Sequence, residues 1–183
     1  YILYPDSSFL DRTSISLQTQ VRHNYDGILK DLRITPSINF SMVGQTYLYL
    51  SYQVVHNERY NNKYFKGVNR VVISLNTRPL KEVSLNIFAH LGKFIYRTDN
   101  PTLGNGHNIS ASITLKPTSK LNLEFSYDRA RLSDEISDEL FYDGNIYRCV
   151  AIYQFSQETF FRTILQYNSF DDSYRLYPLF SYK

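Results

Sequence analysis

The sequence has no tryptophan, one cysteine, one methionine and no long run of apolar residues. Its single cysteine, Cys149, excludes an intrachain disulfide framework, because a disulfide needs two thiols. No stretch approaches about 18 consecutive apolar residues, so we expect no transmembrane helix. A membrane protein built from strands is still allowed, because a barrel strand shows lipid only every second side chain. The net charge of +3 is close to balance, and we therefore expect no nucleic-acid partner.

Aromatic residues are abundant, with 17 Tyr and 12 Phe among 183 residues. A tyrosine has an apolar ring and a polar hydroxyl, so many tyrosines require many positions that are half apolar and half wet. Antiparallel sheets, binding surfaces and membrane interfaces all provide such positions. The length of the chain predicts one domain over residues 1–183.

A strict alternation of apolar and polar residues is the clearest pattern in the sequence. From Asn108 to Lys116 every second residue is apolar, and the others are Asn, Ser, Thr or Lys. A period of two predicts a β-strand with one apolar and one polar face. The same period, less regular after residue 147, predicts ten strands, over residues 14–21, 33–42, 47–54, 70–76, 83–91, 108–116, 121–128, 147–153, 161–167 and 176–182.

The connections between these predicted strands alternate in length. Four are as short as hairpin turns: 43–45, 78–81, 117–120 and 156–158. Three of the intervening connections are longer and polar: 57–67, 97–106 and 129–144. A barrel with short turns at one end and long loops at the other produces this alternation, whereas a soluble β-sandwich has no reason to produce it. Pro36 and Pro178 fall inside predicted strands and remove backbone donors, so we expect bulges or a locally open edge there.

These patterns predict an all-β fold: an antiparallel, up-and-down transmembrane β-barrel in the outer membrane of a Gram-negative bacterium. A strand of about eleven residues tilted by about 45° spans roughly 25 Å, the height of an outer-membrane apolar band. We expect outer-membrane lipid as a partner, and the barrel-assembly machinery during insertion. Ten strands could close a narrow barrel or form part of a wider wall.

The polar face of the predicted strands would line the lumen of such a barrel. Two interpretations of its charges are open: a network that fills and rigidifies the lumen, or a basic path for anionic solutes. We weight the first about three to one. The lumen-lining candidates are Arg33, Arg70, Glu124, Asp128, Arg148, Arg162 and Arg175.

Several tyrosines fall near the ends of predicted strands and would form aromatic girdles at the membrane interfaces. Cross-strand aromatic packing explains them almost as well, and a carbohydrate-binding surface is a third, weaker interpretation. The interfacial candidates are Tyr47, Tyr96, Tyr127, Tyr142, Tyr153 and Tyr167.

Catalytic and metal-binding signals are weak. No histidine has metal-ligand spacing or an obvious nucleophile beside it, and Cys149 is predicted to face outward on a strand. His56 and His107 could lie near the outer rim, where a membrane-embedded hydrolase would need a Ser or Asp beside a His. The acidic loop that includes Asp134, Glu135 and Asp138 is a weak calcium candidate without the fixed spacing of a calcium motif. We therefore predict no catalytic residue, no metal and no cofactor.

Residues 142–183 resemble a known protein family. The motifs are Tyr142-Asp143-Gly144-Asn145-Ile146-Tyr147-Arg148, Tyr153-Gln154-Phe155, Phe161-Arg162, Leu165-Gln166-Tyr167-Asn168-Ser169-Phe170 and Tyr177-Pro178-Leu179-Phe180-Ser181-Tyr182-Lys183. They are similar to the C-terminal barrel of large Gram-negative outer-membrane proteins of unknown function, in which the barrel follows a module resembling family 9 carbohydrate-binding domains. The resemblance implies a wider barrel, a chain incomplete at both ends, and no catalytic residue. Any role with sugars would come by association with that module.

Three hypotheses about function follow. The first is a non-enzymatic outer-membrane barrel that serves as an anchor and as a transport channel for a glycan or small solute. The second is a soluble or surface β-rich binding module that uses exposed tyrosines, for example on glycans. The third, at low weight, is a membrane-embedded hydrolase at the barrel rim.

Overall fold

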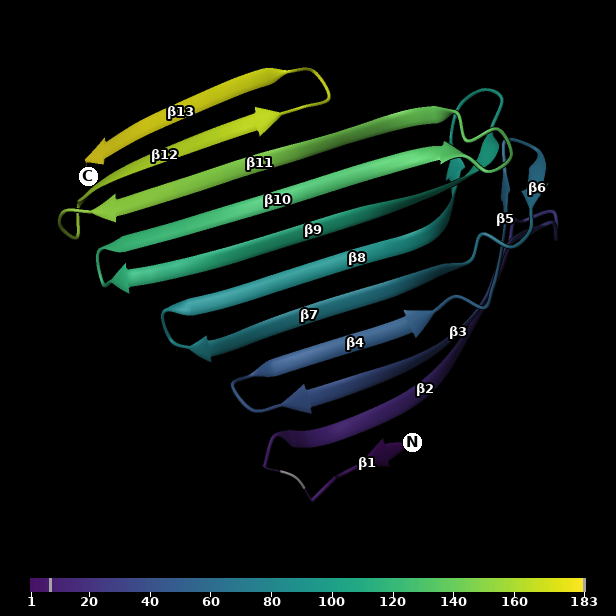
Figure 1. Cartoon of the computed structure of the whole chain (residues 1–183), viewed down its shortest axis with the longest axis horizontal. Coiled ribbons are helices and arrows are strands. Elements are labelled where there is room, and N and C mark those ends of the chain that lie inside the picture. Colours follow the sequence, from purple (N-terminus) through teal and green to yellow (C-terminus); the bar gives the residue numbers. More distant parts are fainter. Residues whose placement is uncertain (7, 183) are drawn as a thin grey trace.

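Every regular element of the structure is a β-strand. The computed structural model describes residues 1–6 and 8–182, and within them thirteen strands form one antiparallel sheet (Figure 1). Among these residues there is no helix long and apolar enough to cross a membrane. The strands are β1 (Ile2–Leu3), β2 (Leu10–His23), β3 (Leu29–Met42), β4 (Thr46–Tyr52), β5 (Val55–Tyr60), β6 (Lys63–Phe65), β7 (Arg70–Leu80), β8 (Val83–Tyr96), β9 (Thr102–Thr118), β10 (Leu121–Asp134), β11 (Leu140–Gln154), β12 (Thr159–Asn168) and β13 (Ser173–Tyr182).

The strands follow one another across the sheet as a meander. The main path runs β1-β2-β3-β4-β7-β8-β9-β10-β11-β12-β13. β5 and β6 leave this path, because β5 pairs with residues Asp31–Ile34 of β3 and β6 pairs with β5. β1 and β13 are the two edges, and within the described residues no ladder joins them, so the sheet is not closed into a barrel. The narrow ten-stranded barrel that the sequence allowed is therefore not formed here.

All ten predicted strands are confirmed, as β2–β4 and β7–β13. The short connections lie at one end of the sheet, called here the turn end, and the β2–β3, β4–β5, β8–β9, β10–β11 and β12–β13 connections lie at the opposite, loop end (Figure 1). The prediction of three long loops was wrong. Of the predicted loops 97–106 and 129–144, only 97–101 and 135–139 lie outside strands, and 57–67 forms most of the β5–β6 hairpin. These segments are polar because they extend the sheet beyond its apolar face, and polarity alone does not distinguish such an extension from a loop.

The two prolines lie where the sheet tolerates them. The ladder between β3 and β4 stops at Ser37, and pairing resumes with β5 at Ile34, so Pro36 stands at a gap in that ladder. This gap confirms the locally open edge expected there. Pro178 keeps its pairing with Thr163 without a register shift, because β13 is an edge strand with a side that has no ladder.

In-register pairing gives the sheet one apolar and one polar face. The sheet is a single layer, and much of the apolar face is open: Leu17 is 68% exposed, Leu165 51% and Leu176 63%. A row of directly opposed residues on the apolar face runs through Ile15, Ile38, Leu50, Ile73, Ala89 and Ile109. The neighbouring row on the polar face runs through Ser14, Asn39, Tyr49, Ser74, Phe88 and Ser110.

The strands are staggered along the sheet. One row of opposed residues begins at Phe40, near the turn end of β3, and finishes at Tyr174, near the loop end of β13. The apolar residues shift with the strands. In the row of Ile109, the residues on this face are no longer apolar on the next two strands: Arg129 lies opposite Ile109 on β10, and Asn145 lies opposite Arg129 on β11. The apolar band therefore runs diagonally across the hydrogen-bonded rows.

Glycines at the loop end allow the sheet backbone to pack closely. Gly106 lies opposite both Gly92 and Leu132, and Leu132 is 1% exposed. A Cβ atom placed on Gly106 would lie 2.1 Å from the Arg131 carbonyl oxygen and 3.0 Å from the Leu132 Cα. Because these neighbours are backbone atoms, they cannot yield without disturbing the β9–β10 ladder.

We predict that Gly106→Ala lowers the free energy of unfolding by about 3 kcal/mol or more, because the added methyl group forces backbone atoms apart. The control is Gly27→Ala, where a Cβ meets nothing within 4 Å and only the positive φ of 74° is strained, which costs about 1 to 2 kcal/mol. Urea unfolding of both variants measures the difference. An equal loss in the two variants would contradict the proposed close packing.

Candidate functional site

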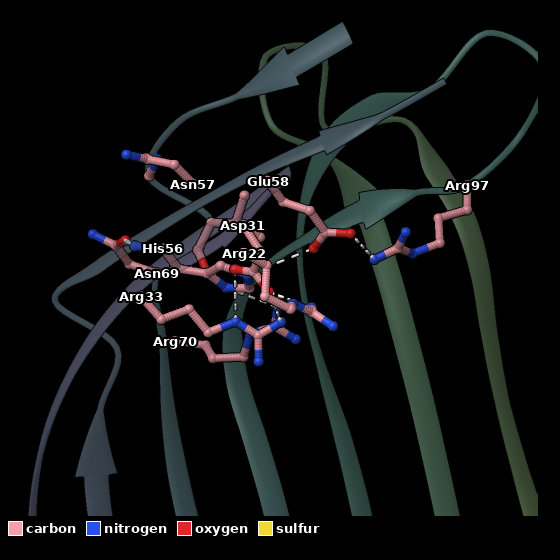
Figure 2. Close-up of polar contacts among 11 residues, drawn as sticks. Arg22, Asp31, Arg33, His56, Asn57, Glu58, Asn69, Arg70 and Arg97 are labelled. Carbon is pink, nitrogen blue, oxygen red and sulfur yellow. Dashed lines mark hydrogen bonds and ion pairs between the residues drawn. The ribbon is translucent and has the colours of Figure 1, made fainter. Parts of the chain in front are cut away.

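A group of charges around a buried carboxylate occupies the polar face at the loop end, where β2, β3, β5 and β7 meet (Figure 2). Its centre is Asp31, which is 1% exposed. The Asp31 carboxylate accepts hydrogen bonds from Arg33 Nε at 3.0 Å and from Arg22 Nη2, and it forms an ion pair with Arg33 Nη2 at 2.9 Å. A buried carboxylate is tolerated only when such partners satisfy it. We call the set of Arg22, Asp31, Arg33, His56, Glu58, Arg70 and Arg97 the Asp31 cluster.

His56 lies beside Asp31 and is also 1% exposed. Its Nδ1 is 2.9 Å from the Val68 carbonyl oxygen, and its Nε2 is 3.5 Å from Glu58 Oε2 and 3.8 Å from Asp31 Oδ1. All three neighbouring atoms are oxygen acceptors. The hydrogen bond from His56, together with the charge and hydrogen bond of Arg97, lowers the pKa of Glu58 to about 2, against the opposing effect of burial.

Arg70 completes the inner part of the cluster. Its guanidinium lies over the Phe94 ring, 4.6 Å from the ring centroid, and its Nη2 is 3.3 Å from His56 Nδ1. The Val68 carbonyl oxygen and the Arg70 guanidinium compete for this nitrogen, because the carbonyl needs a donor and the guanidinium needs an acceptor. Arg70 Nε is buried and has no hydrogen-bond partner among the described residues.

The β5–β6 hairpin is tied across to the 97–101 connection. Arg97 Nη2 donates to Glu58 Oε1 at 2.5 Å, and the Arg97 guanidinium lies 4.8 Å from the Tyr60 ring centroid. Lys63 Nζ donates to Asn100 Oδ1 at 2.5 Å. Asn61 Nδ2 donates to the carbonyl oxygen of Asp99 at 2.7 Å. The Asp31 cluster therefore joins the hairpin to β3 on one side and to the β8–β9 connection on the other.

The charges of the cluster suit the attraction of an anion. Four guanidinium groups outnumber two carboxylates, so the polar face is electropositive at this end. Both His56 nitrogens face carbonyl or carboxylate oxygens. At His107, Nε2 accepts a hydrogen bond from Arg129 Nε at 2.9 Å. Among residues 1–6 and 8–182 no serine hydroxyl is hydrogen-bonded to either histidine.

The register places all seven predicted lumen residues on the polar face, but it brings only Arg33 and Arg70 together, in the Asp31 cluster. The other five are spread over β10–β13. Asp128 accepts a hydrogen bond from the Ser110 hydroxyl, and Arg148 and Arg175 lie on either side of Gln166 in one row. The five candidates spread over β10–β13 are Glu124, Asp128, Arg148, Arg162 and Arg175. The lumen role of this face remains a prediction.

The sequence pattern did not indicate four residues of the cluster as site residues: Arg22, Asp31, Glu58 and Arg97. It predicted His56 only near the rim. One signal was available, because Asp31 and Arg33 are two residues apart on one strand and so share a face. Glu58 and Arg97 carried no such signal, since both fell in segments expected to be loops. Only the pairing of β5 with β3 brings Glu58 opposite Asp31.

The six tyrosines predicted at membrane interfaces divide between the two faces. Tyr47, Tyr96 and Tyr142 lie on the polar face, where a girdle facing lipid cannot include them. The remaining three are on the apolar face, but Tyr127 lies in the middle of β10 and not near a strand end, because β10 continues to Asp134. The other two apolar-face tyrosines are Tyr153 and Tyr167.

Tyr127 belongs to a row of four tyrosines on neighbouring strands. The ring centroids are 5.1 Å apart for Tyr127 and Tyr147, 6.2 Å for Tyr147 and Tyr167, and 4.6 Å for Tyr167 and Tyr174. The Tyr127 hydroxyl donates to Asn145 Oδ1 at 2.9 Å. We call Tyr127, Tyr147, Tyr167 and Tyr174 the tyrosine row.

The predicted acidic metal loop is not arranged for a metal. Both the Ile136 and the Ser137 backbone N–H donate to Asp134 Oδ1 at 2.9 Å, and Glu135 pairs with Lys93. Within the described part of the chain, no group of three or more His, Cys, Asp or Glu side chains is placed to hold a metal ion. Cys149 lies on the apolar face, opposite Phe125 and Leu165, as the alternation predicted.

Comparisons of the chain with protein-family models, with curated proteins and with solved structures found no match. The resemblance of residues 142–183 to an outer-membrane barrel family therefore remains a prediction. The geometry of the two faces and of the Asp31 cluster carries the proposals that follow.

We predict that stability falls in acid through Glu58. Its pKa in the folded protein is about 2, below the ordinary value of 4.5, so its stabilising contribution is fully present above pH 4.5 and is lost as the pH falls towards 2. After allowance for solvent screening we expect a loss of about 1 to 2 kcal/mol. Urea unfolding at a series of pH values measures it.

Glu58→Gln should show a smaller loss between pH 4.5 and pH 2 than the parent protein, because it has no carboxylate to protonate. The matched control is Glu139→Gln, since Glu139 lies in the 135–139 connection and its carboxylate makes no ion pair among the described residues. If Glu58→Gln and Glu139→Gln have the same pH dependence, the ionic attachment of the hairpin is wrong.

Proposed function

We propose that this sheet is part of the wall of an outer-membrane β-barrel, with its apolar face against lipid and its polar face along an aqueous lumen. In this arrangement β2–β4 and β7–β13 cross the membrane, and the β5–β6 hairpin extends beyond it at the loop end. The protein anchors in the outer membrane and offers a charged, hydroxyl-rich surface to solutes that pass along the lumen.

The single observation that carries this proposal is the apolar face of a one-layer sheet, which is continuous from β2 to β13 and open to the surroundings. Exposed apolar patches on soluble monomers are usually limited to a few hundred Å². A face of this extent is stable in lipid, which covers it, and unfavourable in water. An outer-membrane barrel is the β-structure that needs such a face.

The diagonal course of the apolar band supports the same proposal. Barrel strands are tilted, so a flat lipid layer crosses them at an angle to their hydrogen-bonded rows, and neighbouring strands are staggered. Here the row that lies near the turn end of β3, at Phe40, lies near the loop end of β13, at Tyr174. A sheet covered by a second soluble layer has no need for this displacement.

A charged network marks the end of the apolar band on β9–β11. Arg129 Nη2 lies 3.1 Å from Asp143 Oδ1, and Arg129 Nε donates to His107. Arg131 lies on the same face, one row further from the band, and its Nε is 4.0 Å from Asp143 Oδ2. Charges of this kind suit the headgroup region beyond the hydrocarbon.

The tyrosine row is the observation that favours the second candidate function, a glycan-binding module. Aromatic rings and polar hydroxyls side by side are suitable for contact with sugars as well as with a membrane interface. The two functions differ in solubility: a barrel wall requires detergent for extraction, whereas a binding module is released into buffer. The tyrosine row lies on the apolar face, together with Ile113 and Leu165. This face therefore either contacts lipid or binds a glycan, and it cannot do both.

We predict that Ile113→Arg destabilises the natural full-length protein in lipid by about 2 to 4 kcal/mol, because it places a charge on the lipid face of β9. The matched control is Ser112→Arg, which changes the adjacent residue on the polar face. The folded fraction is measured from heat-modifiable mobility on a gel, with urea unfolding in vesicles for the free energy.

A protein that is found in the outer-membrane fraction, needs detergent and tolerates Ser112→Arg but not Ile113→Arg supports the barrel wall. A protein released into buffer, or equal tolerance of the two substitutions, would refute the lipid-facing assignment. Release into buffer together with glycan binding at the tyrosine row would establish the second candidate in its place.

A further inference from the structure

A small polar pocket lies on the polar face next to the Asp31 cluster. Its volume is about 190 Å³, and its lining includes Arg33, Tyr49, Ser51, Gln53 and His90. The lining residues come from β2, β3, β4, β7 and β8, with Gln53 from the short connection that follows β4, so five strands of the main sheet build most of the pocket. We call it the Ser51 pocket.

Two buried polar atoms of this pocket lack partners. Ser51 is only 6% exposed, and its Oγ has no hydrogen-bond partner among the described residues. The Oε1 of Gln53, two residues further along the chain and just beyond the end of β4, is also buried and has no hydrogen-bond partner among the described residues. Buried polar groups are rarely left without a partner, because each unsatisfied group costs about 1 to 3 kcal/mol. These two atoms therefore indicate that something other than this chain's side chains bonds to them.

Arg33 gives the pocket its charge. Its Nε and Nη2 both bind Asp31, which leaves Nη1 without a partner among the described residues. Arg33 is 31% exposed, so it is accessible from the polar face. Asp31 is shared with Arg22, and Arg70 lies close by, so one carboxylate does not neutralise the guanidinium groups at this end of the pocket. The pocket is thus positive beside Arg33 and hydrogen-bonding beside Ser51 and Gln53.

We propose that the Ser51 pocket binds a small hydroxylated carboxylate. The ligand carboxylate pairs with Arg33 Nη1, and ligand hydroxyl groups bond to Ser51 Oγ and Gln53 Oε1. The volume of about 190 Å³ limits the ligand to a molecule of roughly six carbons or fewer. The binding itself does not depend on the proposed function. Its role as a step in the passage of a solute through a lumen does rest on that function.

The test is isothermal titration calorimetry on the full-length protein with three six-carbon probes. D-Gluconate has both the carboxylate and the hydroxyl groups, sorbitol has the hydroxyl groups without the charge, and hexanoate has the charge without the hydroxyl groups. We expect saturable binding of gluconate, with sorbitol and hexanoate each weaker by about 10-fold or more, because each lacks one of the two kinds of contact.

Two variants locate the site. Ser51→Ala should weaken gluconate binding by about 3- to 10-fold, and it should fold normally because Ser51 Oγ has no partner in the chain to lose. Gln53→Met removes the second acceptor at similar length and should weaken binding to a similar degree. The matched control is Ser84→Ala, on β8 and on the same face but outside the pocket, which should bind gluconate as the parent protein does.

Absence of gluconate binding to folded parent protein, or equal affinity of Ser51→Ala and Ser84→Ala, would overturn the proposal and leave a pocket that holds water only. Failure of the pocket proposal can be distinguished from failure of the proposed function. A protein that does not enter membranes but binds gluconate through Ser51 refutes the barrel wall and supports the pocket. A protein that inserts in the outer membrane without binding gluconate refutes the pocket alone.

Discussion

A one-layer sheet cannot bury its own apolar face, and the rest of this structure depends on that constraint. Each strand alternates in polarity, and in-register pairing keeps like side chains in line, so the alternation of single strands becomes two faces of different chemistry. Leu17, Leu165 and Leu176 remain open on one of them. The apolar face must be covered from outside, and in the proposed barrel wall lipid covers it over the whole width of the sheet.

At the loop end, the side chains of the polar face hold together a sheet that divides. β4 stops near Pro36, and β5 takes over the pairing with β3, so the sheet divides there. The divided end is held by ionic and hydrogen-bonded contacts around Asp31 and Glu58 in place of a hydrophobic core. Such contacts cost desolvation, but they leave an excess of positive charge facing the same side as the Ser51 pocket. The ionic contacts that hold the divided end of the sheet together thus also give the polar face its charge.

The strands and their faces could be predicted from the sequence, because a period of two is a local property that each segment carries by itself. The β5–β6 hairpin could not, since Asn57–Tyr60 and its neighbours are polar on both faces and resemble a loop. The Asp31 cluster could be predicted only in part: Asp31 and Arg33 share a face by spacing, but Glu58 and Arg97 join them through strand pairing across long sequence separations. The tyrosines show the same limit, since the face of Tyr96 or Tyr142 depends on where its strand starts and how it pairs.

The most direct test of the central claim, that the apolar face meets lipid and the polar face meets water, uses the single natural cysteine. A spin label on Cys149 lies on the apolar face of β11, and a label on Arg148→Cys in a Cys149→Ser background lies one residue away on the opposite face. Relaxation by oxygen, which concentrates in lipid, and by a water-soluble nickel chelate is measured for both labels in the membrane-inserted protein. We predict that oxygen relaxes the label at 149 and the chelate relaxes the label at 148. Equal access of the chelate to both labels, or the reverse order, would contradict it.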